Sequence, residues 1–305
     1  PEQELGKGRV IRDTHSATTG LYPLYEETAA IFQKMDVPPD FQADKPIRFT
    51  HRRTESKDIY FIANTKNQKV NATCRFRVQQ GAPQLWNPAT AEIRPLPQFT
   101  REGELTSVPI VFEPNQSFFV IFPRNGVSKD SALSGSVNFP TITPAATLQG
   151  SWEVAFDPKW GGPAKVTFPA LQDWSQHKED GIKHYSGMAT YRKSFDPPKI
   201  TGKRVYLDLG KVHEIAEVTL NGKNLGTIWC APWRIDITDA LKKQSNQLEI
   251  RVANLWTNRL IGDAGKPVEK RFTRTALRRP PVGRALKPSG LLGPVEIMVE
   301  TTTAE

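Results

Sequence analysis

YRKSF (Tyr191–Phe195) is the first strand-like segment in the stretch that decides the fold. This stretch runs from Gly187 to Asp263. Further segments of strand or turn character follow YRKSF: VYLDLG (Val205–Gly210), VTLNGKNLG (Val218–Gly226), APWRIDITDAL (Ala231–Leu241), LEIRVANLW (Leu248–Trp256) and NRLIGD (Asn258–Asp263). β-branched and aromatic residues are frequent in them, as in short antiparallel strands. The Asn-Gly pair within LNGKNLG supplies the positive φ that a tight hairpin turn requires. The run therefore predicts an antiparallel β-sandwich.

The composition is that of a globular chain rich in strands and loops. Its 305 residues indicate two domains, or one large β domain with an appendage. Hydrophobic residues make up 38% and charged residues 24%, which leaves enough apolar mass for a core. The 25 prolines favour short strands and loops over long helices. No run of about 18 apolar residues is present, so the sequence contains no candidate membrane-spanning helix.

Residues 1–45 differ from the rest of the chain. GKGRVI (Gly6–Ile11) predicts a short buried strand, and YEETAAIFQKM (Tyr25–Met35) predicts a helix with an apolar stripe and acids in its first turn. VPPDF (Val37–Phe41) ends that helix. A strand–helix unit without partners cannot fold alone, so we expect it to be the remnant of the end of a (β/α) barrel. The start at Pro1, with no secretory segment after it, also indicates a fragment whose targeting signal was removed or never present.

The remaining residues predict two β-sandwiches. Residues 46–126 contain short alternating segments such as DIYFIANT and SFFVIFPR, and they indicate a small antiparallel sandwich. Residues 127–147 are rich in Ser, Thr, Pro and Ala, which is typical of a linker or of an extended crossing strand. Residues 148–305, from GSWEV to VEIMVE, indicate a second sandwich. The predicted fold class is mainly β, with two sandwiches after a short α/β remnant.

Four groups of motifs resemble a known family. They are GKGRV with the helix and VPPDF, THRRTESKDIYFIANT (Thr50–Thr65), LWNPATAEI with SFFVIFPR, and NLWTNRLIGD with SGLLGPV (Ser289–Val295). From Gly6 to about Val299 the chain resembles the C-terminal region of glycoside hydrolase family 106, the α-L-rhamnosidase-like enzymes. The run from Gly187 to Asp263 resembles the galactose-binding-like jelly roll of many glycoside hydrolases. Ala91 stands where the family usually has Gly, which predicts a different type of turn there.

The resemblance implies a non-catalytic part of a larger enzyme. The catalytic carboxylates of the family lie in an N-terminal barrel, so no catalytic residue is transferred to this chain. The expected partners are that barrel, absent here, and a plant or bacterial polysaccharide or oligosaccharide. The expected location is the periplasm or the exterior of a bacterium. A stand-alone carbohydrate-binding module is the alternative.

The chain itself gives little sign of catalysis. Glycoside hydrolysis needs two carboxyl groups across the scissile bond. The spacing of the loop acids Asp157, Asp173, Glu179 and Asp180 forces no such pair, and we favour a solvated loop. The sequence contains no GxSxG, P-loop, dinucleotide or HExxH motif.

The candidate carbohydrate-binding residues are aromatic and polar side chains in loops. Sugars stack their C–H faces on indoles and offer hydroxyls to planar polar groups. Trp160 and Trp174 are either sugar platforms or covers over the sandwich edge, and His184 ends the same region. Trp256, Asn258 and Arg259, with Asp263, form either the rim of a ligand site or an arginine–aspartate clamp with Trp256 as its lid.

Three further features leave alternatives open. The resemblance implies a structural calcium ion, for which Asp157, Asp208, Asp236 and Asp239 are candidate ligands, although no D-x-D-x-D pattern is present. The basic residues from Lys266 to Lys287 indicate either a polyanion-binding loop or a solvated one, and no nucleic-acid motif accompanies them. Cys74 and Cys230 are either free thiols or an interdomain disulfide, and His51–Arg53 either face the absent barrel or make interdomain ion pairs.

Overall fold

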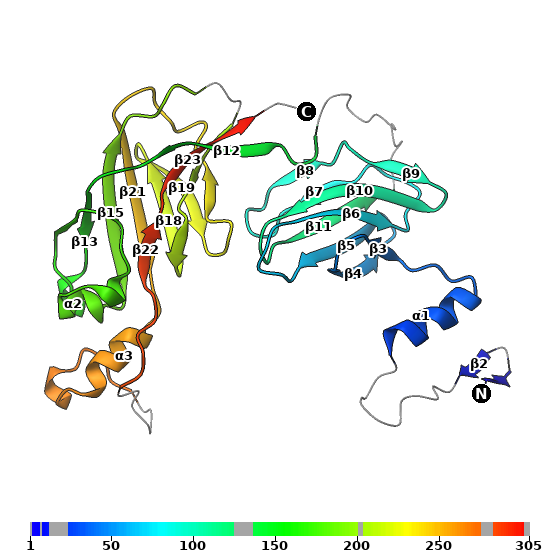
Figure 1. Cartoon of the computed structure of the whole chain (residues 1–305), viewed down its shortest axis with the longest axis horizontal. Helices are drawn as coiled ribbons and strands as arrows, with labels where there is room; N and C mark the ends of the chain where they lie inside the picture. The colour runs from blue at the N-terminus through cyan, green and yellow to red at the C-terminus, as the bar shows by residue number, and fades with distance from the viewer. Residues whose placement is uncertain are drawn as a thin grey trace.

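The computed structural model confirms a mainly β protein (Figure 1). The structure describes residues 2–6, 8–11, 24–124, 137–200, 204–275 and 283–301. Within them, antiparallel strands form two sandwiches, each around its own apolar core. No helix in these residues is long and apolar enough to cross a membrane.

The first sandwich consists of two sheets. One has the order β3-β6-β10-β9, with bounds Phe41–Ala43, Val70–Phe76, Leu105–Phe112 and Thr100–Glu102. The other has the order β4-β5-β11-β7-β8, with bounds Ile47–Arg53, Lys57–Asn64, Ser117–Pro123, Gln84–Trp86 and Ile93–Pro95. Strict alternation of buried and less buried residues in β5, β6 and β10 aims one face of each strand at the shared core.

The second sandwich is larger. Its six-stranded sheet has the order β14-β13-β15-β21-β18-β19, with bounds Val166–Phe168, Trp152–Ala155, Met188–Phe195, Asn246–Ala253, Ile215–Leu220 and Lys223–Ile228. The facing sheet has the order β12-β23-β16-β20, with bounds Thr141–Thr147, Glu296–Thr301, Val205–Asp208 and Arg234–Asp236. A short pair joins β17 (Lys211–His213) to β22 (Gly290–Gly293).

The Asn-Gly turn forms as the sequence predicts. Asn221 and Gly222 have φ values of 53° and 81° between β18 and β19. Both residues are therefore in the left-handed region that a two-residue hairpin needs. Ala91 also has a positive φ, of 58°. Its backbone therefore lies in the left-handed region, which Gly adopts at lower cost.

The N-terminal elements are exposed. β2 (Gly8–Ile11) pairs with β1 (Glu2–Leu5) in an antiparallel hairpin, and every residue of β2 is exposed. The prediction of a buried strand was therefore wrong. The predicted helix is confirmed as α1 (Tyr25–Lys34), but none of its residues is buried. The origin of this unit in a (β/α) barrel stays a prediction.

The segment predicted as a linker contributes a strand to the second sandwich. Residues 125–136 lie outside the described residues, and β12 occupies the segment from Thr141 to Thr147. β12 pairs with β23 along its length, with one irregularity between Pro144 and Ala146. The crossing-strand interpretation of this segment therefore holds for its second half.

Cys74 and Cys230 are free thiols, so the disulfide alternative was wrong. Cys74 is buried in β6, and burial raises the pKa of its thiol to about 12. Burial also raises the pKa of the Cys230 thiol. Both cysteines are therefore poor nucleophiles at neutral pH.

A charged network anchors the entry into the first sandwich. His51 lies between two carboxylates, with Nδ1 3.3 Å from Asp40 Oδ2 and Nε2 3.0 Å from Asp58 Oδ1, and its ring stacks on that of Tyr60. Arg53 donates to the buried Asp58 at 2.7 Å. These contacts all lie within one sandwich, and ion pairs of the arginines in this segment with another domain stay a prediction.

The same network makes the first sandwich sensitive to acid. A hydrogen bond from Arg77 holds the pKa of Asp40 below its usual value. A carboxylate with a lowered folded-state pKa adds stability above its unfolded pKa of about 4, and this stability is lost as pH falls through the folded pKa. We expect the urea midpoint of the wild type, measured by circular dichroism, to fall more steeply than that of Asp40→Asn as the pH decreases below about 4. Parallel curves for the two proteins would contradict this role of Asp40.

Candidate functional site

The predicted site residues gather at one end of the second sandwich, around α3 (Thr257–Ala264), which follows β21 (Figure 1). Two short 3-10 helices, η1 (Pro158–Trp160) and η2 (Trp174–Gln176), and the short helix α2 (Asp180–Lys183) carry most of the other candidates. The predicted residues therefore lie close together in the fold, and their role as a ligand site stays a prediction. The exposure and contacts of each side chain decide which of them a ligand can reach.

Arg259 is the centre of a buried clamp. Its side chain is 3% exposed, and its Nη1 lies 3.5 Å from Oδ1 of Asp263, one helical turn later on α3. Nη2 donates to the carbonyl oxygen of Trp160 at 3.2 Å, and the guanidinium lies 4.6 Å from the ring centroid of Phe272. Burial lowers the pKa of the guanidinium, and the charge of Asp263 opposes that shift.

Asp263 extends the clamp to the next segment. Its Oδ2 accepts hydrogen bonds from both the backbone nitrogen and the hydroxyl of Thr273, each at 2.8 Å. The two charges therefore tie together η1, α3 and the segment after it. The clamp interpretation is correct for Arg259 and Asp263, and the buried Arg259 side chain is not open to a ligand. Trp256 is no lid, because 65% of it is exposed.

Trp160 is an exposed indole whose backbone is held by neighbouring residues. It ends η1, whose first turn is capped by Asp157 through a hydrogen bond from the nitrogen of Lys159. Gly161 follows with a φ of 82°, and a Cβ there would lie 2.7 Å from the Phe272 ring. With 47% of its surface exposed and its carbonyl held by Arg259, Trp160 presents an indole to solvent on a fixed backbone.

Trp174 belongs to the core and is not a sugar platform. It is fully buried, and its Nε1 donates to the hydroxyl of Tyr191 at 2.6 Å. The structure therefore contradicts contact between Trp174 and a ligand. The signal that could have shown this is the alternation in MATYRKSF, which aims Tyr191 inward and gives a buried indole its polar partner.

Asn258 and His184 are also structural. The Asn258 amide donates to the carbonyl of Lys287 and to the hydroxyl of Ser289, while its oxygen accepts from the nitrogen of Lys287. Asn258 is buried, so a ligand-contacting role for it is contradicted. The half-buried His184 packs against Gly262 of α3, where a Cβ would lie 2.5 Å from the imidazole ring. Its Nδ1 lies 3.2 Å from Oδ1 of Asp180.

Two of the loop acids are helix caps. Asp157 caps η1, and Asp173 caps η2 while also accepting from the nitrogen of Ser289. The carboxylate oxygens of these two aspartates accept hydrogen bonds from backbone nitrogens. Asp180 pairs with His184 and Lys266. The solvated-loop interpretation therefore needs correction for Asp157 and Asp173.

The four predicted calcium ligands do not fit a common site. Asp208 pairs with Arg234 at 2.9 Å, and Asp236 pairs with Arg204 at 2.8 Å and accepts from Thr238. Within the described parts of the chain, no group of three or more acidic, histidine or cysteine side chains is placed to hold a metal ion. Calcium binding gains no support from these aspartates.

The basic segment from Lys266 to Lys287 is only partly described. Arg278 and Arg279 lie outside the described residues. Five of its described basic residues are exposed: Lys270, Arg271, Arg274, Arg284 and Lys287. The Nζ of Lys266 lies 3.7 Å from Oδ2 of Asp180. The polyanion hypothesis therefore stays a prediction.

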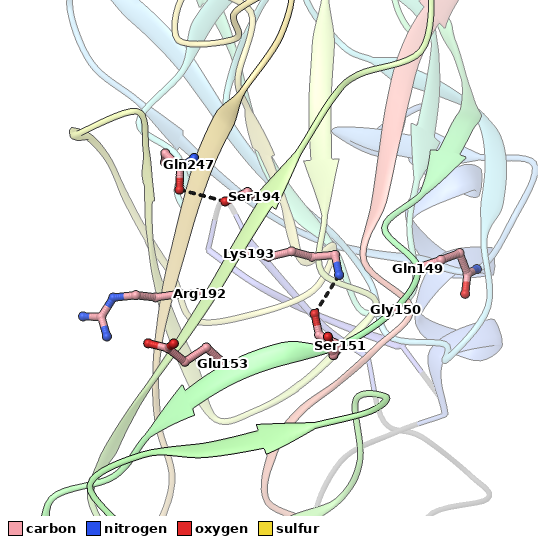
Figure 2. A pocket seen from close by; sticks show the side chains of 8 residues that line it. All are labelled: Gln149, Gly150, Ser151, Glu153, Arg192, Lys193, Ser194 and Gln247. Atoms are coloured by element: carbon pink, nitrogen blue, oxygen red, sulfur yellow. Dashed lines mark hydrogen bonds between the residues drawn. The ribbon is translucent and has the colours of Figure 1, made fainter.

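A shallow depression lies elsewhere on the same sandwich, and sequence reasoning missed it (Figure 2). It has a volume of about 530 Å³, and β13, β15 and β21 contribute to its lining of Gln149, Gly150, Ser151, Glu153, Arg192, Lys193, Ser194 and Gln247. None of these belongs to a recognisable motif. The usable signal is Lys193, a charged residue at a position where alternation along β15 predicts an apolar one.

Comparison with known proteins shows what this chain is similar to. Residues 7–101 match the family model of glycoside hydrolase family 106, described as alpha-L-rhamnosidase. Residues 174–281 match the model of the glycosyl hydrolase 2 galactose-binding domain-like family. Both resemblances seen in the sequence are thereby confirmed.

Two relatives extend the comparison. A rhamnosidase structure from Novosphingobium sp. PP1Y is 35% identical, covers 97% of this chain and 27% of that chain, and superposes with a TM-score of 0.82. A putative beta-glucuronidase of Formosa agariphila is 38% identical over 208 residues, which are 59% of this chain and 18% of that protein. The chain therefore spans less than a third of either relative.

The clamp predicts a large effect of removing either charge. We expect Arg259→Met and Asp263→Asn each to lower the free energy of unfolding of the second sandwich by about 3 kcal/mol, because each leaves a buried group without its partner. Urea unfolding followed by tryptophan fluorescence is a suitable measurement, since six of the seven tryptophans lie beyond residue 148. Trp256→Ala is the control, with an expected change below about 0.5 kcal/mol. An Arg259→Met protein as stable as this control would contradict the clamp.

Proposed function

We propose that this chain is the non-catalytic C-terminal part of an α-L-rhamnosidase-like glycoside hydrolase, where it supports a catalytic barrel and contacts glycan. The similarity to the Novosphingobium rhamnosidase over 97% of this chain supports the proposal. That match covers 27% of the rhamnosidase chain, so a supporting role leaves room for catalysis elsewhere in such a protein.

The observation that carries the supporting role is the exposed apolar surface of the N-terminal elements. Large apolar side chains of β1, β2, α1 and the residues beside α1 are exposed: Leu5, Val10, Ile11, Leu24, Tyr25, Phe32, Met35 and Val37. A helix with an apolar stripe normally buries it against a partner. A catalytic barrel would cover this surface and give the hairpin and α1 the packing they lack among the described residues.

The chemistry of the acids is consistent with a non-catalytic chain. Asp157 and Asp173 cap 3-10 helices, and Asp263 belongs to the buried clamp. An acid/base pair needs carboxyl groups that face a shared substrate, roughly 5 to 10 Å apart. The roles seen for these three aspartates are structural.

A stand-alone carbohydrate-binding module is the second candidate, and a specific observation favours it. Trp160, Trp229 and Trp256 are all exposed on the second sandwich. Exposed indoles are the usual stacking surface for the C–H faces of sugars. Either role fits a bacterial protein that works in the periplasm or outside the cell on polysaccharide, and this location is part of the proposal.

The proposal predicts that the chain alone does not hydrolyse glycosides. We expect no release of 4-nitrophenol from 4-nitrophenyl α-L-rhamnoside above the rate without protein, because Asp157, Asp173 and Asp263 are held in structural roles. A complete rhamnosidase of the same family serves as the positive control. Turnover that is lost when an aspartate or glutamate of this chain is replaced would overturn the proposal.

The carbohydrate-binding module predicts a dependence on exposed indoles. Retention in affinity gels containing soluble polysaccharide should weaken on Trp160→Ala, because the stacking surface is removed while the clamp keeps its carbonyl partner. Ile93→Ala, which removes an exposed apolar side chain from the first sandwich, provides the control. Equal retention of the wild type and the Trp160→Ala protein would exclude Trp160 as a platform.

A further inference from the structure

Lys193 breaks the alternation of its strand. Along β15, Ala189 and Tyr191 are fully buried and face the core, and Lys193 occupies the next position on that face. Its partner across β21 is Leu248, which is also buried. Lysine is rare at core-facing positions, and Lys193 occupies one near the end of its strand, where its ammonium reaches solvent. A departure of this kind from local pattern is expected mainly at functional sites.

The Lys193 ammonium has no carboxylate partner in the described part of the chain. Its Nζ donates to the carbonyl oxygen of Ser151 at 2.9 Å and lies 5.0 Å from the ring centroid of Trp152. Burial lowers the pKa of Lys193, and no nearby charge opposes that shift. An ammonium has three donors, so the single hydrogen bond leaves capacity for a ligand.

The other charges around the depression are already paired. Arg192 donates to Glu249 at 2.9 Å, and Glu153 forms an ion pair with Lys165. The hydrogen bond from Lys165 lowers the pKa of Glu153, so this carboxylate is charged and neutralised by its partner. Lys193 therefore supplies the charge of the depression that is not compensated.

The remaining lining suits a hydroxylated ligand. Figure 2 shows the Lys193 side chain extending toward Ser151, with Gln247 and Ser194 joined by a hydrogen bond on one side. Gln149 completes a set of amides and hydroxyls from separate segments. Amides and hydroxyls are among the groups that bind sugar hydroxyls.

The contact with Trp152 uses the charge only in part. The stem of the lysine shields the indole, and the exposed ammonium adds a cation–π attraction at 5.0 Å from the ring centroid, but neither contact supplies a counterion. Lys193 therefore has a property that packing alone does not require. An anionic ligand would use it.

We propose that this depression binds an anionic sugar residue of a polysaccharide, with the Lys193 ammonium pairing with its carboxylate or sulfate group and the amides and hydroxyls binding its hydroxyls. The inference rests on the proposed function, which it deepens by naming the position and the ligand class. It does not depend on the exposed indoles around α3.

Titration calorimetry on the full chain tests the proposal with two anionic probes and their neutral counterparts. Tetragalacturonate is compared with its methyl ester, and a sulfated carrageenan tetrasaccharide with its desulfated form. We expect at least one anionic probe to bind and its neutral counterpart to bind at least about tenfold more weakly, as a charge-assisted contact requires. The carboxylate and sulfate arms identify which anion is bound.

The variants separate charge from packing. Lys193→Met should weaken binding of the anionic probe by about tenfold or more, while Lys193→Arg retains most of it. Lys223→Met, at an exposed position of β19, is the control with the same change of net charge and should bind like the wild type. Circular dichroism melting checks that each variant is folded.

Two outcomes would overturn the proposal. One is the absence of binding to both anionic probes at millimolar concentration, and the other is equal binding by wild type and folded Lys193→Met. Neither outcome affects the supporting role, which is tested by the absence of glycosidase turnover. A Lys193→Met protein that fails to fold is replaced by Lys193→Gln, to which the same criteria apply.

Discussion

The hydroxyl of Tyr191 is the contact on which the second sandwich depends most. It accepts hydrogen bonds from Nε1 of Trp174 at 2.6 Å and from the backbone nitrogen of Leu291 at 3.2 Å. Tyr191 lies on the six-stranded sheet, Trp174 on η2 and Leu291 on β22, so one buried oxygen joins three segments far apart in sequence. Burial raises the pKa of this hydroxyl, which keeps it neutral and able to accept both bonds.

That contact also sets the surroundings of the predicted site. With Trp174 held inward, Gly290 must pack directly on its indole, where a Cβ would lie 2.3 Å from Nε1. Ser289, the residue before it, then contacts both Asp173 and Asn258. The polar residues around α3 consequently serve the packing of the loops, and the exposed indoles Trp160 and Trp256 are left as the surfaces that a glycan can reach.

The two parts of the site differ in what holds them. Around α3, Arg259 and Asp263 form a buried pair with Nη1 3.5 Å from Oδ1, so each buried charge has a counterion. At the depression on β13 and β15, Lys193 has a carbonyl and an indole but no counterion among the described residues. This difference is the reason for proposing ligand binding at Lys193 separately from the supporting role.

The sequence by itself determined the class of fold, the α1 helix, the Asn221–Gly222 hairpin and the relatives, because each of these depends on local patterns of alternation, turn residues or motifs. It did not determine which aromatic side chains are buried. Trp160 and Trp174 both lie in loop-like sequence, and only packing of η2 against Tyr191 made one of them core. Nor could it show that Lys193 has no acid beside it, since the neighbours of a side chain across a sandwich come from strands and loops distant in sequence. Burial and charge pairing are properties of the assembled sheets, and for this reason only the tertiary structure decided which of these side chains are exposed and which are paired.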